Sequence, residues 1–260
     1  LVRPGSSLDR LRDCEHAVRR YVFDGQIPPL ANYLRDHGIQ LVFHLASHFL
    51  VEHHPEDVGP LVASNVLLGT QLLEAMRLSE CLLLINTGTF WQHFQDASEP
   101  VCLYAATKTA FEAIVRYYAS AHTLRAITLK LFHSYGPDDP RPKLFSVFRR
   151  AALSDEPVDM SPGEQLIDLV HVDDVVSAYL VAAARLCEGA VSGWESYAVS
   201  SGNPLPLREV ARIYEQATGV ALNIRWGGRP YRSREVMVPW RGEVLPGWRP
   251  TISLACGLRP

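Results

Sequence analysis

The chain has 260 residues, of which 47% are hydrophobic, and a formal net charge of −3 at pH 7. This length supports one large domain, or two closely packed ones, with a substantial core. The charge balance argues against a surface for nucleic acid or anionic membranes, and the longest apolar runs are too short to span a membrane. Five scattered cysteines without a CxxC pair predict reduced thiols in a cytoplasmic protein. Ten histidines without ligand spacing such as HExxH predict no metal site.

Short apolar runs alternate with amphipathic stretches along the first half of the chain, which is typical of a parallel sheet with helices on both faces. The expected elements are a strand at 21–23, a helix at 29–37 ended by Gly38, a strand at 40–45, a helix at 62–78, a strand at 81–86, a helix at 104–121 and a strand at 126–132. This order predicts an α/β fold, a Rossmann-type doubly wound parallel sheet, whose ligands bind beyond the carboxyl ends of the strands. Residues 44–47, 87–89 and 133–136 follow those ends and are predicted to converge.

The pattern changes after Pro137, where turn-rich segments alternate with helices expected at 144–153, 172–185 and 207–218. We predict a dinucleotide-binding domain of residues 1–137, to which 165–185 and 195–202 return. Residues 138–164 and 203–260 would form a smaller, interleaved substrate-binding lobe. No GxGxxG or GxxGxxG turn occurs in the sequence. Residues 1–5 resemble the tail of a strand, so we expect a first strand, glycine turn and helix to precede residue 1.

The strongest chemical signal is the pair Tyr104 and Lys108, which lie one turn apart on one face of a predicted helix. A lysine cation at this distance favours the tyrosinate and lowers a phenol pKa from about 10. Such a tyrosine can exchange a proton with a carbonyl or hydroxyl near neutral pH, and Thr87 can hydrogen-bond the same oxygen. This is the proton half of a carbonyl reduction, and the hydride must come from a cofactor. The spacing alone is weak, because an exposed Tyr/Lys pair is common in helices.

Several further motifs accompany this pair in a fixed order. Residues 44–47 resemble an HxAA turn, 64–70 an xNxxGT helix, 131–137 the segment fNxYGP, 168–175 the segment RDfxyVdDv, and 247–258 a terminal GWxPxxxLxxGL. Together they resemble the extended short-chain dehydrogenase/reductase family, in its nucleotide-sugar epimerase/dehydratase/reductase branch. The likeness spans nearly the whole chain.

The resemblance implies that Tyr104 is the proton donor, Lys108 binds the nicotinamide ribose and Thr87 orients the substrate carbonyl. Asp24 matches an acid that hydrogen-bonds the adenine amine, with a simple turn aspartate as the alternative. Asn65 matches a residue near the ribose, with a buried structural asparagine as the alternative. The other cofactor-binding residues that the resemblance implies are Arg3, Ser6, Gly25, Leu45, Ala46, Ser47 and His133.

Arg3 bears on the choice of cofactor. Members that prefer NAD carry an acidic residue at this position, whereas an arginine pairs with a 2′-phosphate and stacks on adenine. The resemblance therefore favours NADP (NADPH) over NAD. An exposed arginine at a strand end is the alternative interpretation.

Departures from the family pattern narrow the reaction. Thr87 is followed by Gly88 and Thr89, not by the Asp-Glu pair with which 4,6-dehydratases eliminate water, and no cysteine lies there for a 3,5-epimerising reductase. The chain most resembles NADPH-dependent 4-ketoreductases, including the CDP-abequose synthase type, that act on a nucleoside-diphosphate 4-keto-6-deoxyhexose in deoxysugar biosynthesis. An NAD-dependent nucleotide-sugar 4-epimerase and a catalytically silent dinucleotide-binding regulator remain alternatives.

Two positions of the substrate site differ from the family pattern. His133 stands in place of an asparagine, with a neutral core histidine as the alternative, and Ile167 in place of an arginine that contacts the pyrophosphate. Lys143, Arg149, Arg229 or Arg232 could supply that contact, although the arginines could also be solvated surface charges. The remaining expected substrate-binding residues are Thr87, Thr89 and Phe90.

The family resemblance also implies a homodimer through a four-helix bundle built from the helices at 62–78 and 104–121. Four apolar positions allow such an interface, although they could equally face the sheet. They are Phe111, Ile114, Val115 and Tyr118.

Overall fold

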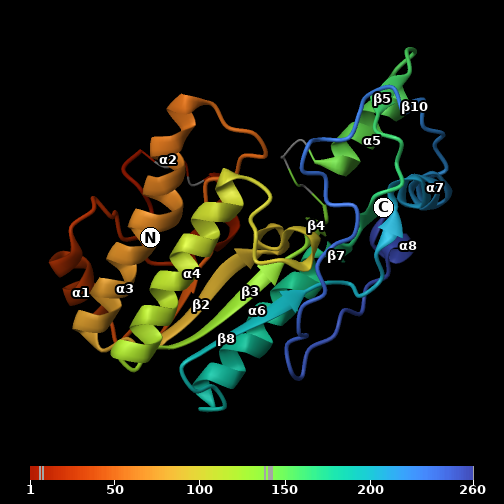
Figure 1. The fold of residues 1–260 in the computed structure, drawn as a ribbon. Coiled ribbons are helices and arrows are strands. Elements are labelled where there is room, and N and C mark those ends of the chain that lie inside the picture. The colour runs from red at the N-terminus through yellow and green to blue at the C-terminus, as the bar shows by residue number, and fades with distance from the viewer. Residues whose placement is uncertain (6, 8, 138, 140–142, 260) are drawn as a thin grey trace.

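The computed structural model describes residues 1–5, 7, 9–137, 139 and 143–259. Its four-stranded sheet is parallel, in the order β1-β2-β3-β8 (Figure 1). The strands span Leu41–His44, Leu83–Thr89, Arg125–Leu131 and Trp194–Val199. Apolar residues of β2 and β3 are buried on both faces, as in parallel sheets covered by helices on either side. The predicted α/β fold class is confirmed.

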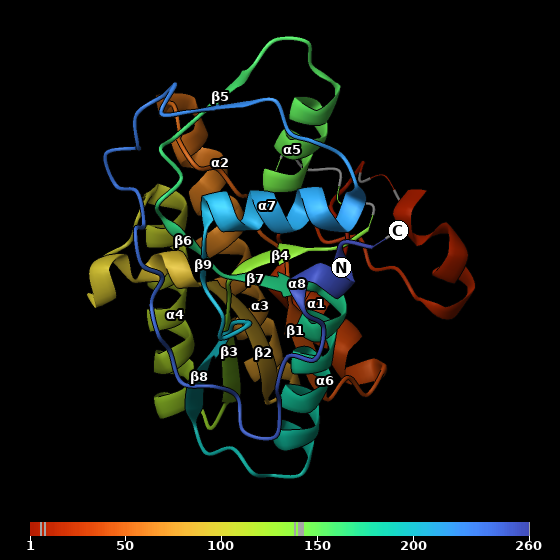
Figure 2. The same cartoon turned by 90° about the vertical axis from the view of Figure 1, so that its right-hand side faces the viewer.

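Successive strand residues point to opposite faces of this sheet, and each face has its own helices. Leu84 and Ala126 pack with α3 (Leu68–Ser79), α4 (Leu103–Ala121) and, outside α3, α1 (Ile27–Asp36). Ile85 and Ile127 pack with α6 (Val172–Cys187) on the opposite face. Figure 2, turned by 90°, shows α6 and α4 flanking the strands.

The predicted helix at 62–78 is part of a longer helical run. α2 (Val58–Val62) leads into a single π turn, η3 (Ala63–Leu67), and then into α3. π turns inside helices are frequent at functional sites. This one contains Asn65, a predicted site residue.

The prediction that β2 ends at Asn86 was wrong, because its pairing with β3 continues through Thr87, Gly88 and Thr89. Those polar residues look like a turn in the sequence, yet they form the last three rungs of the ladder. α4 begins one residue before its predicted start and ends at the predicted residue. The strand expected at 21–23 is reduced to one bridge between Val2 and Val22. A 3₁₀ segment, η1 (Asp9–Ala17), follows Val2.

The apolar positions of α4 that were considered for a dimer interface face inward instead. Phe111, Val115 and Tyr118 are buried in the cluster with α3 and the sheet, and Ile114 packs against it. The outward face of α4 carries Tyr117, which is more than half exposed.

The second half of the chain adds a smaller group of elements around its own hydrophobic cluster, which includes Phe148, Met160 and Tyr214. It contains α5 (Leu144–Leu153) and α7 (Leu207–Thr218), which match their predicted bounds, and the short α8 (Leu254–Gly257). Three strand pairs connect it: β4 (His133–Tyr135) with β7 (Leu169–His171), β5 (Val158–Met160) with β10 (Ile224–Trp226), and β6 (Leu166–Ile167) with β9 (Leu205–Pro206). The division into two domains remains our proposal. In the described part of the chain no helix has the length and apolarity to cross a membrane.

Candidate active site

The carboxyl ends of the parallel strands bring the predicted site segments to one edge of the sheet. β1 ends at His44 and is paired with β2, whose last residues are Thr87, Gly88 and Thr89. His133 begins β4 just after β3 ends. The pairing register of the strands therefore brings these residues to the same edge of the sheet. Within each strand, alternate side chains point to opposite faces.

Three hydroxyl groups from different elements gather at this edge. The Thr87 Oγ1 atom of β2 lies 2.6 Å from the hydroxyl oxygen of Tyr179 on α6. Tyr104 on α4 is 9% exposed, so it faces the interior and not bulk solvent. Burial raises the pKa of Tyr179 to about 12; the Thr87 hydrogen bond opposes this rise, and the charge of Tyr104 contributes to it. Tyr179 is therefore a neutral hydroxyl close to both predicted catalytic groups.

Sequence reasoning missed Tyr179. It sits among Ala, Leu and Val on the helix that covers the sheet, so it looks like an ordinary core residue. The available signal was its hydroxyl, because a buried tyrosine oxygen needs a hydrogen-bonding partner.

Lys108 is 2% exposed, and its Nζ atom has no hydrogen-bonding partner among the described residues. Burial lowers its pKa to about 8. The Nε2 atom of His44 is equally buried and unpartnered, and burial together with the nearby Lys108 charge lowers the His44 pKa to about 3. Unsatisfied buried polar groups are costly. Two of them at a sheet edge fit a ligand rich in hydroxyl oxygens, such as the ribose of a nicotinamide dinucleotide.

Asn65 connects the loop after β1 to the helix that carries Tyr104. Its Nδ2 atom donates to the His48 carbonyl and to Thr107 Oγ1, both at 2.9 Å, and its Oδ1 atom accepts from the His48 backbone N–H at 2.7 Å. Thr107 in turn donates to the Tyr104 carbonyl at 2.7 Å. Asn65 is fully buried and joins these two segments, and its place near the ribose stays a prediction. Thr107 is a second residue that sequence reasoning missed.

The other predicted cofactor residues lie on exposed turns near the strand ends. Asp24 accepts a hydrogen bond from the backbone N–H of Gln26 at 3.1 Å in the turn before α1, and its contact with adenine stays a prediction. The Gly25 carbonyl accepts from the Gln71 side chain at 3.0 Å. Arg3 is exposed on the turn after Val2, residues 45–47 lie exposed beyond β1, and Ser6 falls outside the described residues.

His133 lies among aromatic rings and two cations. Its ring is edge-on to Phe90, with ring centroids 5.0 Å apart. Desolvation, together with the charges of Lys143 and Arg232, lowers its pKa to about 4. The imidazole is therefore neutral at physiological pH. Of the two cations, Lys143 forms an ion pair with Asp139 at 3.2 Å. Lys143 also donates to the Ser134 carbonyl at 3.1 Å.

Four other predicted substrate-binding residues are either buried within the fold or exposed on the smaller lobe. Thr89 is buried, and its Oγ1 atom accepts from the Trp91 N–H to cap the turn η4 (Phe90–Gln92). Phe90 is buried and stacks on Phe132 at 4.7 Å. Both side chains are therefore engaged within the fold, and their contact with substrate stays a prediction. Arg149 and Arg229 are exposed, on α5 and after β10, and no described contact directs them to the strand edge.

Gly88 separates Thr87 from Thr89 in a crowded position, next to Gln92, Lys130 and Thr128. A Cβ atom there would lie 2.8 Å from Gln92 Oε1 and 3.0 Å from carbon atoms of both Lys130 and Thr128. Only glycine fits at this distance. The close approach explains why no larger residue stands directly after Thr87.

Residues 9–193 match the model of the NAD dependent epimerase/dehydratase family. The chain is 29% identical over 226 residues to a CDP-abequose synthase of Salmonella muenchen, covering 85% of this chain and 75% of that protein. It is 24% identical to UDP-glucuronate 4-epimerase 6 of Arabidopsis thaliana, in a match that covers 84% of this chain and 53% of that protein.

Solved structures share the fold. MoeE5 in complex with UDP-glucuronic acid and NAD has a TM-score of 0.76 at 25% identity, covering 92% of this chain and 83% of MoeE5. A second match is a double mutant of the dTDP-glucose 4,6-dehydratase DesIV from Streptomyces venezuelae with NAD bound. Its TM-score is 0.79 at 23% identity, and the match covers 95% of this chain and 79% of DesIV. These matches confirm the predicted resemblance. Because the family model covers well over half of the sequence, the chain belongs to the NAD dependent epimerase/dehydratase family, within the extended short-chain dehydrogenases/reductases.

Proposed function

We propose that this nucleotide-sugar enzyme uses NADPH to reduce the C4 keto group of a nucleoside-diphosphate 4-keto-6-deoxyhexose in deoxysugar biosynthesis. The observation that carries the proposal is the grouping of Thr87, Tyr104 and Tyr179 at the sheet edge that also holds the unpartnered Lys108 ammonium. The similarity to CDP-abequose synthases from three organisms supports a nucleotide-sugar substrate and deoxysugar chemistry.

In this mechanism the protein supplies the proton and orients the substrate oxygen. A bound nicotinamide dinucleotide supplies the hydride. Tyr104 donates its phenolic proton to the sugar oxygen as that oxygen becomes an alkoxide. Thr87 hydrogen-bonds the same oxygen, and Tyr179 of α6 holds the Thr87 hydroxyl through their contact at 2.6 Å. Lys108 stabilises the tyrosinate that remains and donates to ribose hydroxyls of the dinucleotide.

Gly88 favours a reductase over a dehydratase. Elimination of water needs an acid/base pair next to the substrate, and a carboxylate at position 88 would collide with Gln92 and Lys130. The segment therefore offers hydroxyl groups and no acid. Reduction of a ketone needs no acid/base pair in this segment, since the proton comes from Tyr104 and the hydride from the cofactor.

The preference for NADPH follows from Arg3. No acidic residue occurs in residues 1–8 to accept hydrogen bonds from a ribose 2′-hydroxyl, whereas a guanidinium can pair with a 2′-phosphate. Arg3 lies on the exposed turn after Val2, where a bound dinucleotide could reach it.

His133, Lys143 and Arg232 are our candidates for the diphosphate of the sugar nucleotide. Two cations act on one neutral imidazole there, and charge-assisted hydrogen bonds to phosphate oxygens are among the strongest available to a protein. Arg149 and Arg229 are secondary candidates, because they lie exposed on the same lobe.

The direct experiment mixes the protein with NADPH and CDP-, dTDP-, GDP- and UDP-linked 4-keto-6-deoxyhexoses. Loss of nicotinamide absorbance with formation of a C4 alcohol supports the proposal. The similarity to UDP-glucuronate 4-epimerases supports a second candidate, an NAD-dependent 4-epimerase. Interconversion of C4 epimers with no net consumption of NADPH, and with NAD retained through purification, would identify that activity.

We further infer a homodimer formed by the outward faces of the helical run 58–79 and of α4. With Phe111 and Val115 buried, the contact surface would use exposed apolar residues of these helices instead. They are Val62, Leu67, Leu78 and Tyr117. Sedimentation equilibrium of the wild type and of Tyr117→Glu tests this, because a dimer should weaken in the variant.

A further inference from the structure

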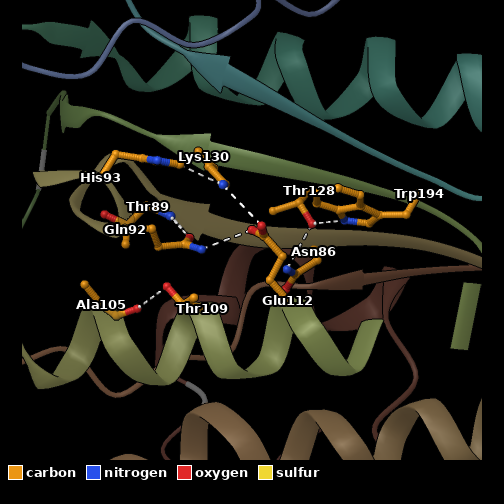
Figure 3. Close-up of polar contacts among 10 residues, drawn as sticks. All are labelled: Asn86, Thr89, Gln92, His93, Ala105, Thr109, Glu112, Thr128, Lys130 and Trp194. Atoms are coloured by element: carbon orange, nitrogen blue, oxygen red, sulfur yellow. Dashed lines mark hydrogen bonds and ion pairs between the residues drawn. The ribbon is translucent and has the colours of Figure 1, made fainter. Parts of the chain in front are cut away.

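A buried network of charged and polar side chains lies near the end of β2 (Figure 3). It is separate from the three hydroxyl groups of Thr87, Tyr104 and Tyr179 at the candidate active site. Lys130 of β3 places its Nζ atom 3.2 Å from Glu112 Oε1 on α4 and 2.9 Å from His93 Nε2. Gln92 Nε2 donates to Glu112 Oε2 at 3.0 Å. The side chains of Lys130 and Glu112 are only 6% and 12% exposed. Desolvation makes such a pair a poor source of stability by itself, which raises the question of what it holds in place.

One branch of the network reaches the strand that carries Thr87. Gln92 Oε1 accepts a hydrogen bond from the Thr89 backbone N–H at 3.0 Å. The Gln92 amide cannot turn over without losing both this bond and the one to Glu112. Gly88 packs directly against Gln92 and Lys130. The pair therefore fixes the backbone immediately after Thr87.

The other branch reaches a segment of the smaller lobe, residues 228–241, which we call the strap. In Figure 1 it is the blue chain that follows β10 and descends toward the four-stranded sheet. Trp240 of the strap stacks on His93, with ring centroids 4.0 Å apart and planes 10° apart. The Lys130 Nζ atom lies 5.4 Å from the centroid of the Trp240 ring, within the range of a cation–π interaction.

A second anchor ties the strap to the loop that continues from β2. The Arg234 guanidinium donates to the Pro100 carbonyl at 3.1 Å and lies 4.2 Å from the centroid of the Phe94 ring. Both anchors thus attach the strap to residues 89–101.

Arg232 lies on the strap two residues before the Arg234 anchor. Its charge acts on Cys102, just before α4, and on His133, at the start of β4. Arg232 therefore lies near the start of α4 and the start of β4. Its position depends on the segment that the buried pair holds.

We propose that Glu112 and Lys130 are positioning residues that hold Thr87 of the catalytic strand and Arg232 of the strap in one geometry. Proton transfer and diphosphate binding then share a single buried anchor. This inference rests on the proposed function for the roles of Thr87 and Arg232.

The test uses Lys130→Met, Glu112→Gln and the conservative variant Lys130→Arg. A matched control is Arg212→Met, which breaks an exposed ion pair with Glu209 on α7. Hydrogen–deuterium exchange is followed in residues 89–101 and 228–241, CDP binding is measured by calorimetry, and steady-state kinetics are recorded well below each Tm. In Lys130→Met and Glu112→Gln we expect faster exchange in both segments together and weaker CDP binding. We also expect kcat to fall by about tenfold or more, since misplacement by about 1 Å can cost about a hundredfold.

NADPH affinity should be unchanged in these variants, Lys130→Arg should retain most activity, and Arg212→Met should behave as wild type. A lower Tm with unchanged kinetics and exchange confined to one segment would overturn the inference, because the pair would then be merely structural. If the wild type reduces no 4-ketosugar, the proposed function fails. The exchange and CDP-binding measurements still decide whether the pair couples the two segments.

Discussion

The hydroxyl of Thr87 lies 2.6 Å from that of Tyr179, and this contact joins β2 to α6 at the carboxyl edge of the sheet. Tyr179 is held neutral, with a pKa of about 12 caused mainly by burial. A neutral phenol can orient the Thr87 hydroxyl toward a substrate oxygen without itself losing a proton.

Tyr179→Phe should therefore lower kcat by about fivefold, in line with the loss of one hydrogen bond of about 1 kcal/mol that orients the transition state. Thr87→Val should cost more, since it removes the group that touches substrate. In the double variant the two effects should not add, because they act through one contact. Full additivity in a double-mutant cycle would show that Tyr179 acts independently of Thr87.

Lys108 should impose an alkaline limit on cofactor binding. Burial lowers its pKa from 10.5 to about 8, so the free protein loses this cation as pH rises through about 8. Because kcat/KM reports the free enzyme, kcat/KM for NADPH should fall above that pH. In Lys108→Arg this fall in kcat/KM should occur at a higher pH, because a guanidinium keeps its proton. A flat profile from pH 7 to about 9 would contradict the role of Lys108.

Lys108→Met should abolish turnover and yet raise the Tm. The folded state binds the Lys108 proton less tightly than the unfolded chain does, so burial of this cation costs stability below about pH 8, and that cost disappears as pH rises toward 10.5. The Tm advantage of the variant should therefore be largest near pH 7 and shrink at alkaline pH. Thermal unfolding at several pH values measures it.

Gly88→Ala should destabilise the protein by about 1–3 kcal/mol, the usual cost of overpacking. The new methyl group would meet Gln92 Oε1 at 2.8 Å and displace the side chain that bonds the Thr89 backbone. Denaturant unfolding provides the free energy. Gly59→Ala is the control, because no atom lies within 4 Å of a Cβ atom there.

Arg3→Glu should shift the cofactor preference from NADPH toward NADH. The carboxylate would repel a 2′-phosphate and accept hydrogen bonds from a ribose 2′-hydroxyl. The ratio of kcat/KM for the two cofactors measures the change. An unchanged ratio would remove the argument for NADPH.

Periodicity predicted the elements with a clean apolar stripe, and α5 and α7 match residue by residue. It failed at the end of β2, because Thr-Gly-Thr has no apolar alternation and its strand conformation comes from pairing with β3. The Tyr104–Lys108 spacing pointed to the site through local helix geometry alone. Tyr179 and the Glu112–Lys130 pair could not be found in this way. Their contacts depend on which helix covers which face and on the register that sets Gly88 opposite Lys130.

The central claim is that the Tyr104 phenol delivers the proton in a ketone reduction, and Tyr104→Phe tests it most directly. General acid catalysis contributes about 10²- to 10⁴-fold, so kcat with NADPH and a 4-ketosugar should fall within that range while the Kd for NADPH stays the same. Turnover close to that of the wild type, with cofactor affinity intact, would contradict the account.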